Sequence, residues 1–138
     1  MWFTYIAVMT VMVINSIQDI RKNEIFPIIT IAGSVCGIIV KALTGAGVLQ
    51  TMLPLCPAMM LFLIFNFLKE AVGFGDVLLF VFVGAWLNAE DVLACAMYAF
   101  CIVLIGAAAL ALCKKKKRHL PFAPFLTAGI TLRLIFLM

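Results

Sequence analysis

Six apolar stretches alternate with short polar breaks along the chain. The breaks read QDIRKNE, TGAG, KEAVGFGD, NAED and KKKKRH, and they hold most of the charged residues. A helix needs about 20 apolar residues to cross a bilayer core about 30 Å thick. The pattern therefore predicts six helices, of which the fourth is short. Their ranges are 1–17, 25–43, 51–68, 77–87, 92–113 and 120–138.

The composition identifies the solvent in which these helices lie. Of the 138 residues, 67% are hydrophobic and 12% are charged, and the mean hydropathy is +1.26. A soluble domain is about 45–50% apolar and about 25% charged, and a chain this small could not bury so much apolar surface. The values exclude a soluble enzyme, a disordered chain and a fibrous protein. We expect an all-α polytopic membrane protein that forms a single transmembrane domain over residues 1–138.

The charge distribution predicts an orientation. Five of the ten basic residues form the run 114–118, and cytoplasmic loops of membrane proteins are rich in Lys and Arg. With the N-terminus outside, the breaks 18–27, 69–76 and 114–119 are cytoplasmic and hold eight of the ten basic residues. We expect this orientation, a multi-pass protein of the inner (cytoplasmic) membrane that contacts lipid, and no nucleic acid partner. The first stretch lacks a basic start and a cleavage site, so we expect a retained helix.

The sequence offers little metal or cofactor chemistry. The five cysteines form no CxxC pair and lie in apolar stretches, where free cysteine packs as a small hydrophobe. The only histidine, His119, lies in the basic run. We therefore expect no metal site and no cofactor.

The three aspartates differ in the side of the membrane that they are expected to face. Asp19 follows one predicted crossing and Asp76 follows three, so both lie on the cytoplasmic side, whereas Asp91 follows four. Ionisable groups at membrane depth are costly and mark functional sites. We expect Asp19 and Asp76 to meet.

Asp76 closes the sequence Gly73-Phe74-Gly75-Asp76. The glycines allow the backbone to leave helical geometry and to approach a substrate chain closely. A helix from Asp76 to about Asn88 would be only about 20 Å long. We therefore expect an irregular turn below the membrane surface, where it lines a wet cavity.

Two facing carboxylates can hydrolyse an amide without a metal, a serine or a histidine. Like charges a few Å apart resist double ionisation, so the pair shares one proton. One carboxylate then acts as a general base on water, while the other donates a proton to the carbonyl oxygen and later to the leaving amine. The pair titrates as a unit, so both assignments of base and acid stay open.

The two aspartate motifs resemble those of a known family. Asp19-Ile20-Arg21, followed by Ile25 and Pro27, resembles the first motif of the type IV prepilin peptidases, and GFGDV at 73–77 is similar to their GxGD motif. GAWL at 84–87 and PFAPF at 121–125 also resemble family sequences, so the likeness covers about residues 15–137.

The resemblance implies a membrane aspartic endopeptidase that cuts the short basic leader from prepilin-like proteins at the cytoplasmic face. The implied catalytic pair is Asp19 and Asp76. Glu24 and Glu70 flank the two motifs and are weak candidates for binding a basic leader, with solvated loop charge as the alternative. The motif residues implied to support the pair are Gly73, Gly75, Arg21 and Pro27.

The sequence departs from the family pattern at three points. Phe26 separates Ile25 from Pro27, and Leu78 stands where the family often has Lys. The chain also lacks the paired CxxC motifs that larger members carry in a domain linked to methylation. We therefore expect the small, peptidase-only form.

Two other functions remain open from the residues alone. The chain could be another membrane aspartic signal peptidase, such as one resembling lipoprotein signal peptidase, which works at the outer face. It could also be a small transporter or channel subunit in which the carboxylates relay protons or bind a cation, although no inverted repeat typical of transporters is visible.

Overall fold

The computed structural model describes residues 2–22, 24–67, 73–112 and 122–137. Within these ranges the chain is helical with short connections and forms no strand, which confirms the all-α class. The helices are α1 (Trp2–Lys22), α2 (Pro27–Leu43), α3 (Val48–Met52), the 3-10 turn η1 (Leu53–Leu55), α4 (Cys56–Phe67), α5 (Phe74–Trp86), α6 (Ala89–Leu112) and α7 (Phe122–Leu137).

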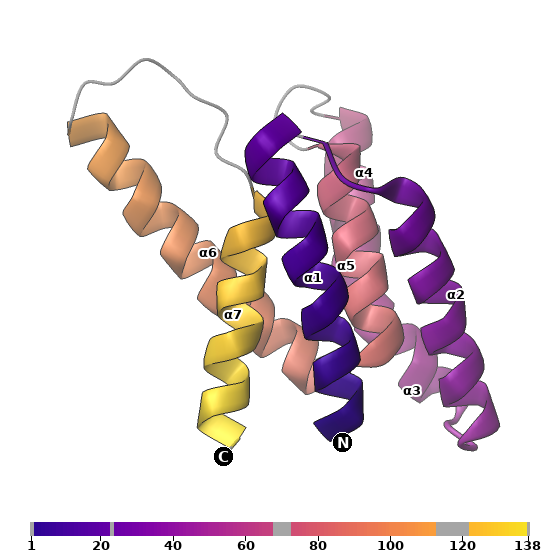
Figure 1. The fold of residues 1–138 in the computed structure, drawn as a ribbon. Helices are drawn as coiled ribbons and strands as arrows, with labels where there is room; N and C mark the ends of the chain where they lie inside the picture. Colours follow the sequence, from indigo (N-terminus) through magenta and orange to yellow (C-terminus); the bar gives the residue numbers. More distant parts are fainter. Residues whose placement is uncertain (1, 23, 68–72, 113–121, 138) are drawn as a thin grey trace.

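Successive segments run in alternating directions, with α3, η1 and α4 acting as one segment (Figure 1). The end of α1 and the starts of α5 and α7 therefore lie at one end of the bundle, which we call the acid end because it carries Asp19 and Asp76. The two chain termini, the α2–α3 connection and the α5–α6 connection lie at the other end, which we call the terminal end (Figure 1).

Among the described residues, three segments are long and apolar enough to cross a membrane. They are Phe3–Lys22, Val48–Phe67 and Ala89–Ala109, whereas α2, α5 and α7 are apolar but shorter. The segment Val48–Phe67 is not one regular helix, because Pro54 and Pro57 lack the N–H that continues the hydrogen-bond ladder. A 3-10 turn forms at that point instead.

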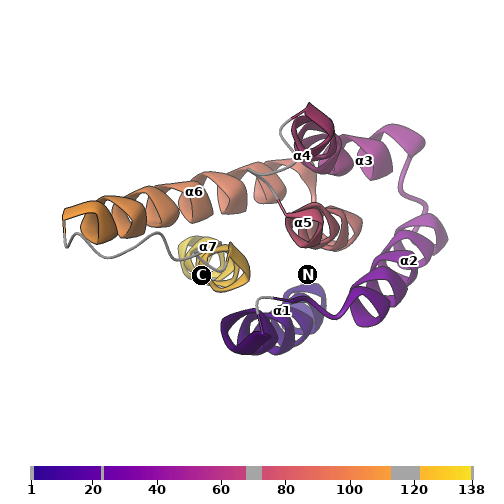
Figure 2. The ribbon, with the colours of Figure 1, turned by 90° about the horizontal axis from the view of Figure 1, so that it is seen from above.

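Helix α5 is the centre of the bundle. It contacts α1, α2, α4, α6 and α7, and in the view from above it lies among them (Figure 2). Its side chains are buried around its circumference, including Val77, Leu79, Phe80, Phe82 and Val83. A helix that is hydrophobic on all sides is one that packs within protein. Helix α5 is therefore enclosed by its neighbours within the described residues.

Two glycines allow α5 and α7 to pack directly against the main chain of neighbouring segments. A Cβ added to Gly84 in α5 would lie 2.6 Å from the carbonyl oxygen of Pro54, and one added to Gly129 in α7 would lie 2.6 Å from that of Cys95. From its contact with α7 near Cys95, α6 inclines away from the bundle toward the acid end (Figure 1).

Candidate active site

Asp19 is held by a helix from the far end of the sequence. It lies in the last turn of α1, is only 8% exposed, and its Oδ2 accepts a hydrogen bond of 3.1 Å from the main-chain N–H of Ala123. Ala123 is the second residue of α7. The first N–H groups of a helix have no partner within the helix and form its positive end. The start of α7 thus provides a donor for an anionic carboxylate.

Asp76 lies at the start of another helix. It is the third residue of α5 after the N-cap Gly73, it is partly buried, and its N–H donates to the Gly73 carbonyl oxygen at 3.1 Å. Its Oδ2 lies 3.7 Å from the position that a Cβ on Gly73 would occupy, so the side chain folds back over the helix end. A carboxylate in the first turn interacts favourably with the helix dipole.

The two carboxylates share the acid end of the bundle. Helices α1 and α5 are in contact, and the charge on Asp19 acts on Asp76, so the two groups lie within electrostatic range of each other. Each group also faces the positive end of a helix, which offsets part of their mutual repulsion. Asp91, in the first turn of α6, lies at the terminal end.

The prediction of an irregular GFGD turn is wrong. Phe74, Gly75 and Asp76 form the first turn of α5, and Gly73 has φ −78° and ψ 143°, which any residue adopts. Gly75 instead leaves room for Ile25, since a Cβ there would lie 2.7 Å from Cδ1, the end of that side chain. The glycine therefore allows the start of α5 to pack against the α1–α2 connection.

The α1–α2 connection is fixed by Asn15, which the sequence analysis did not identify. Asn15 is fully buried; its Oδ1 accepts the Phe26 N–H at 3.3 Å and its Nδ2 donates to Thr30 Oγ1 at 3.1 Å. Phe26 is the N-cap of α2 and Pro27 its first residue, so the inserted Phe26 is accommodated as a cap. The available signal was an amide in an apolar stretch, one helical turn before Asp19.

A second polar contact ties α1 to α7. The hydroxyl oxygens of Ser16 and Thr127 lie 2.6 Å apart, and Thr127 Oγ1 is within 2.8 Å of the Ala123 carbonyl oxygen. Asn15, Ser16 and Asp19 are all buried on α1. Each is bonded to a different point on α2 or α7, so this polar row positions the last turn of α1.

The other predicted site residues are placed less specifically. Arg21 and Glu24 are exposed at the acid end and form no hydrogen bond or ion pair with the described residues. Glu70 lies outside the described residues. Within the described ranges, no three His, Cys, Asp or Glu side chains lie close enough together to hold a metal ion.

The comparisons with known proteins gave one finding. A model of the type IV leader peptidase family matches residues 6–112, a range that contains both Asp19 and Asp76 and ends at the last residue of α6. No match was found among the curated proteins, and none among the solved structures.

Proposed function

Since the chain belongs to the type IV leader peptidase family, we propose that it is an aspartic endopeptidase that removes the leader from prepilin-like membrane proteins. The proposed catalytic groups are the carboxyls of Asp19 and Asp76. The observation that carries the proposal is their convergence at one end of the bundle, within electrostatic range, each facing the start of a helix.

The mechanism uses one proton shared by the pair. The ionised carboxylate takes a proton from water as the water attacks the scissile carbonyl, and the protonated carboxyl donates to the carbonyl oxygen. A proton is then returned to the leaving amine. Because Oδ2 of Asp19 accepts the Ala123 N–H, its Oδ1 is the oxygen left for water or substrate. The starts of α5 and α7 stabilise the negative charge near the reacting atoms.

The proposed topology places this chemistry on the cytoplasmic side. A single transmembrane domain with six crossings and an external N-terminus puts the acid end, with Arg21 and Lys22, in the cytoplasm, as the distribution of basic residues favours. A basic leader would meet Glu24, which is exposed at that end, and Glu70 lies in the predicted cytoplasmic break 69–76 that leads to Asp76. The apolar helix that follows the cleavage point would remain in the membrane.

Cleavage by the purified protein tests the catalytic proposal. The protein is incubated with a leader-bearing prepilin, and the product masses are compared for wild type, Asp19→Asn and Asp76→Asn. Each Asn variant is expected to form no product at an unchanged protein level. Glu90→Gln removes an exposed carboxylate at the terminal end and serves as the matched control, with wild-type cleavage expected. Product formation by either Asn variant at the wild-type rate would refute the proposal.

Labelling of introduced cysteines tests the topology separately. Lys22→Cys at the acid end and Asn88→Cys at the terminal end are compared in intact cells with a thiol reagent that does not cross membranes. Labelling at position 88 and protection at position 22 are expected. The reverse pattern would place the acid pair outside and would favour an outer-face signal peptidase.

A further inference from the structure

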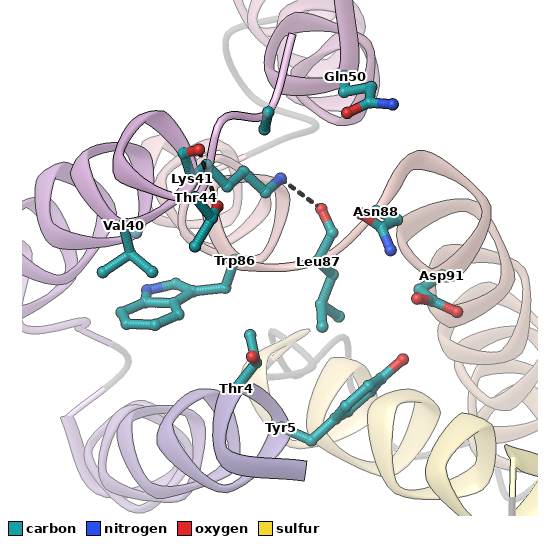
Figure 3. Close-up of a pocket in the computed structure, with 12 residues that line it drawn as sticks. Thr4, Tyr5, Val40, Lys41, Thr44, Gln50, Trp86, Leu87, Asn88 and Asp91 are labelled. Atoms are coloured by element: carbon teal, nitrogen blue, oxygen red, sulfur yellow. Dashed lines mark hydrogen bonds between the residues drawn. The ribbon is translucent and has the colours of Figure 1, made fainter. Parts of the chain in front are cut away.

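A polar cavity of about 310 Å³ lies at the terminal end of the bundle, away from Asp19 and Asp76. It is formed by the start of α1, the end of α2, the start of α3 and the α5–α6 connection (Figure 3). Its volume is within the range of small-molecule sites. The peptidase mechanism uses none of its residues.

Opposite charges face each other across this cavity. Lys41 Nζ donates to the carbonyl oxygens of Gly84 at 2.9 Å and Leu87 at 2.7 Å, and a lysine ammonium has a third donor. Asp91 lies on the other side of the cavity (Figure 3). Arg133 contacts only Oδ1 of Asp91, at 3.0 Å through Nε and at 2.9 Å through a terminal nitrogen. Asp91 thus has an ion pair on one side, and the Tyr5 hydroxyl points toward it from another (Figure 3).

Tyr5 adds a buried hydroxyl without a partner. The residue is 2% exposed and lines the cavity, and its hydroxyl forms no hydrogen bond within the described parts of the chain. The hydroxyl points toward Asp91 (Figure 3). Buried polar groups are nearly always paired, because leaving one unpaired costs free energy. The arrangement therefore provides a polar group that a ligand would satisfy.

Trp86 forms a fixed wall of the same cavity. Its Nε1 donates to the Gly33 carbonyl oxygen at 2.9 Å, and a Cβ on Gly37 would lie 2.9 Å from its ring. Trp and Tyr are the side chains that membrane proteins place at the level of the lipid headgroups. Their presence here, at one end of an apolar bundle, indicates that the cavity lies at the membrane surface.

We infer that this cavity binds the headgroup of a zwitterionic phospholipid, with the phosphate at Lys41 and the ammonium at Asp91. A ligand with both charges complements both walls, whereas a simple phosphate would engage Lys41 alone. The Tyr5 hydroxyl would donate to a phosphate or ester oxygen. The inference depends on the bundle lying in a membrane and does not depend on peptidase activity.

Native mass spectrometry of the full chain in detergent tests the inference. Phosphatidylethanolamine and phosphatidylglycerol with identical acyl chains are compared, since they differ in the ammonium group. Wild-type protein is expected to retain phosphatidylethanolamine about tenfold better, the ratio that a single charged hydrogen bond provides. Water-soluble glycerophosphoethanolamine and inorganic phosphate are tested in parallel and are expected to bind far more weakly.

Two variants and one control assign binding to the cavity. Lys41→Met is expected to lose about tenfold in phosphatidylethanolamine retention, whereas Lys22→Met, which removes an exposed cation at the acid end, is expected to change nothing. Because Lys41 also caps α5, Tyr5→Phe provides a variant that removes only an unpartnered hydroxyl, and it is expected to lose retention severalfold.

Three results would overturn the inference. They are equal retention of the two lipids by the wild-type protein, unchanged retention by Tyr5→Phe, and binding of the water-soluble compounds as strong as that of the lipid. The last result would assign the cavity to a soluble phosphate compound. Loss of prepilin cleavage with intact lipid selectivity would count against the proposed function alone.

Discussion

The main-chain N–H of Ala123 donates a hydrogen bond of 3.1 Å to Oδ2 of Asp19, which joins the start of α7 to the end of α1. Helix α7 lies beyond residues 6–112, the range that the family model matches. The final helix nevertheless contributes a donor to one of the two proposed catalytic carboxyls. We therefore expect the region required for activity to extend to α7.

Removal of this one donor tests the role of α7. Ala123→Pro deletes the N–H at a first-turn position where helices tolerate proline. A hydrogen bond to a charged group is worth about 1.5–3 kcal/mol, so cleavage of a prepilin is expected to slow by about tenfold to a hundredfold. Ala123→Gly retains the N–H and is expected to remain within about threefold of wild type. Equal rates for the proline and glycine variants would exclude a contribution from this donor.

Asn15 is predicted to stabilise the α1–α2 connection. Asn15→Leu keeps the branched shape and the number of side-chain heavy atoms but leaves the Phe26 N–H and the Thr30 hydroxyl without this partner. The free energy of unfolding is expected to fall by about 1–3 kcal/mol, measured by thermal or denaturant unfolding in detergent. Thr10→Val is the control, because Thr10 is exposed and bonds only within α1. A change no larger than that of the control would contradict the assigned role.

The two glycines of the GFGD sequence are predicted to differ. Gly75→Ala places a Cβ against Cδ1 of Ile25, the end of a side chain that must shift, and is expected to cost about 1 kcal/mol, with reduced cleavage. Gly73→Ala meets only ordinary contacts at an ordinary φ and is expected to be nearly neutral. The double variant Gly75→Ala/Ile25→Val removes the obstructing methyl group and should recover activity. No recovery would mean that Gly75 acts in some other way.

The α6–α7 contact offers a matched pair of glycine substitutions. Gly129→Ala directs a Cβ at the Cys95 carbonyl oxygen, a main-chain atom that cannot rotate away, and is expected to destabilise the protein by about 2 kcal/mol. Gly106→Ala meets only the Phe125 ring, at 3.7 Å, and is expected to stabilise α6 by about 0.5–1 kcal/mol. Unfolding in detergent measures both, and a lower stability for Gly106→Ala than for Gly129→Ala would contradict the packing described.

Continuous apolar stretches predicted the order of the helical segments within the described residues, because polar breaks separate each stretch from the next. They predicted helix ends poorly where polar residues continue a helix. Helix α1 runs to Lys22 rather than to residue 17, and Asp19 in this additional turn accepts a hydrogen bond from α7. Prolines within the third stretch produced the 3-10 turn at Leu53–Leu55.

The site was predictable only as far as single residues carry a signal. Asp19 and Asp76 stand out as rare carboxylates at the ends of apolar stretches. Each follows an odd number of predicted crossings, which places both at the same end. The donor of Ala123 is its main-chain N–H, so the identity of the side chain does not indicate this hydrogen bond. The contact between Gly75 and Ile25 depends on the packing of two segments about 50 residues apart, which no local pattern encodes.

The Lys41 contacts also affect the opposite end of the bundle. By donating to the carbonyl oxygens of Gly84 and Leu87, this lysine of α2 attaches the end of α5 to α2. Asp76 lies in the first turn of α5, at the opposite end of the same helix. The position of Asp76 relative to Asp19 thus depends on contacts about 15 Å away, and we expect loosening of this anchor to change the alignment of the two acids without touching either one.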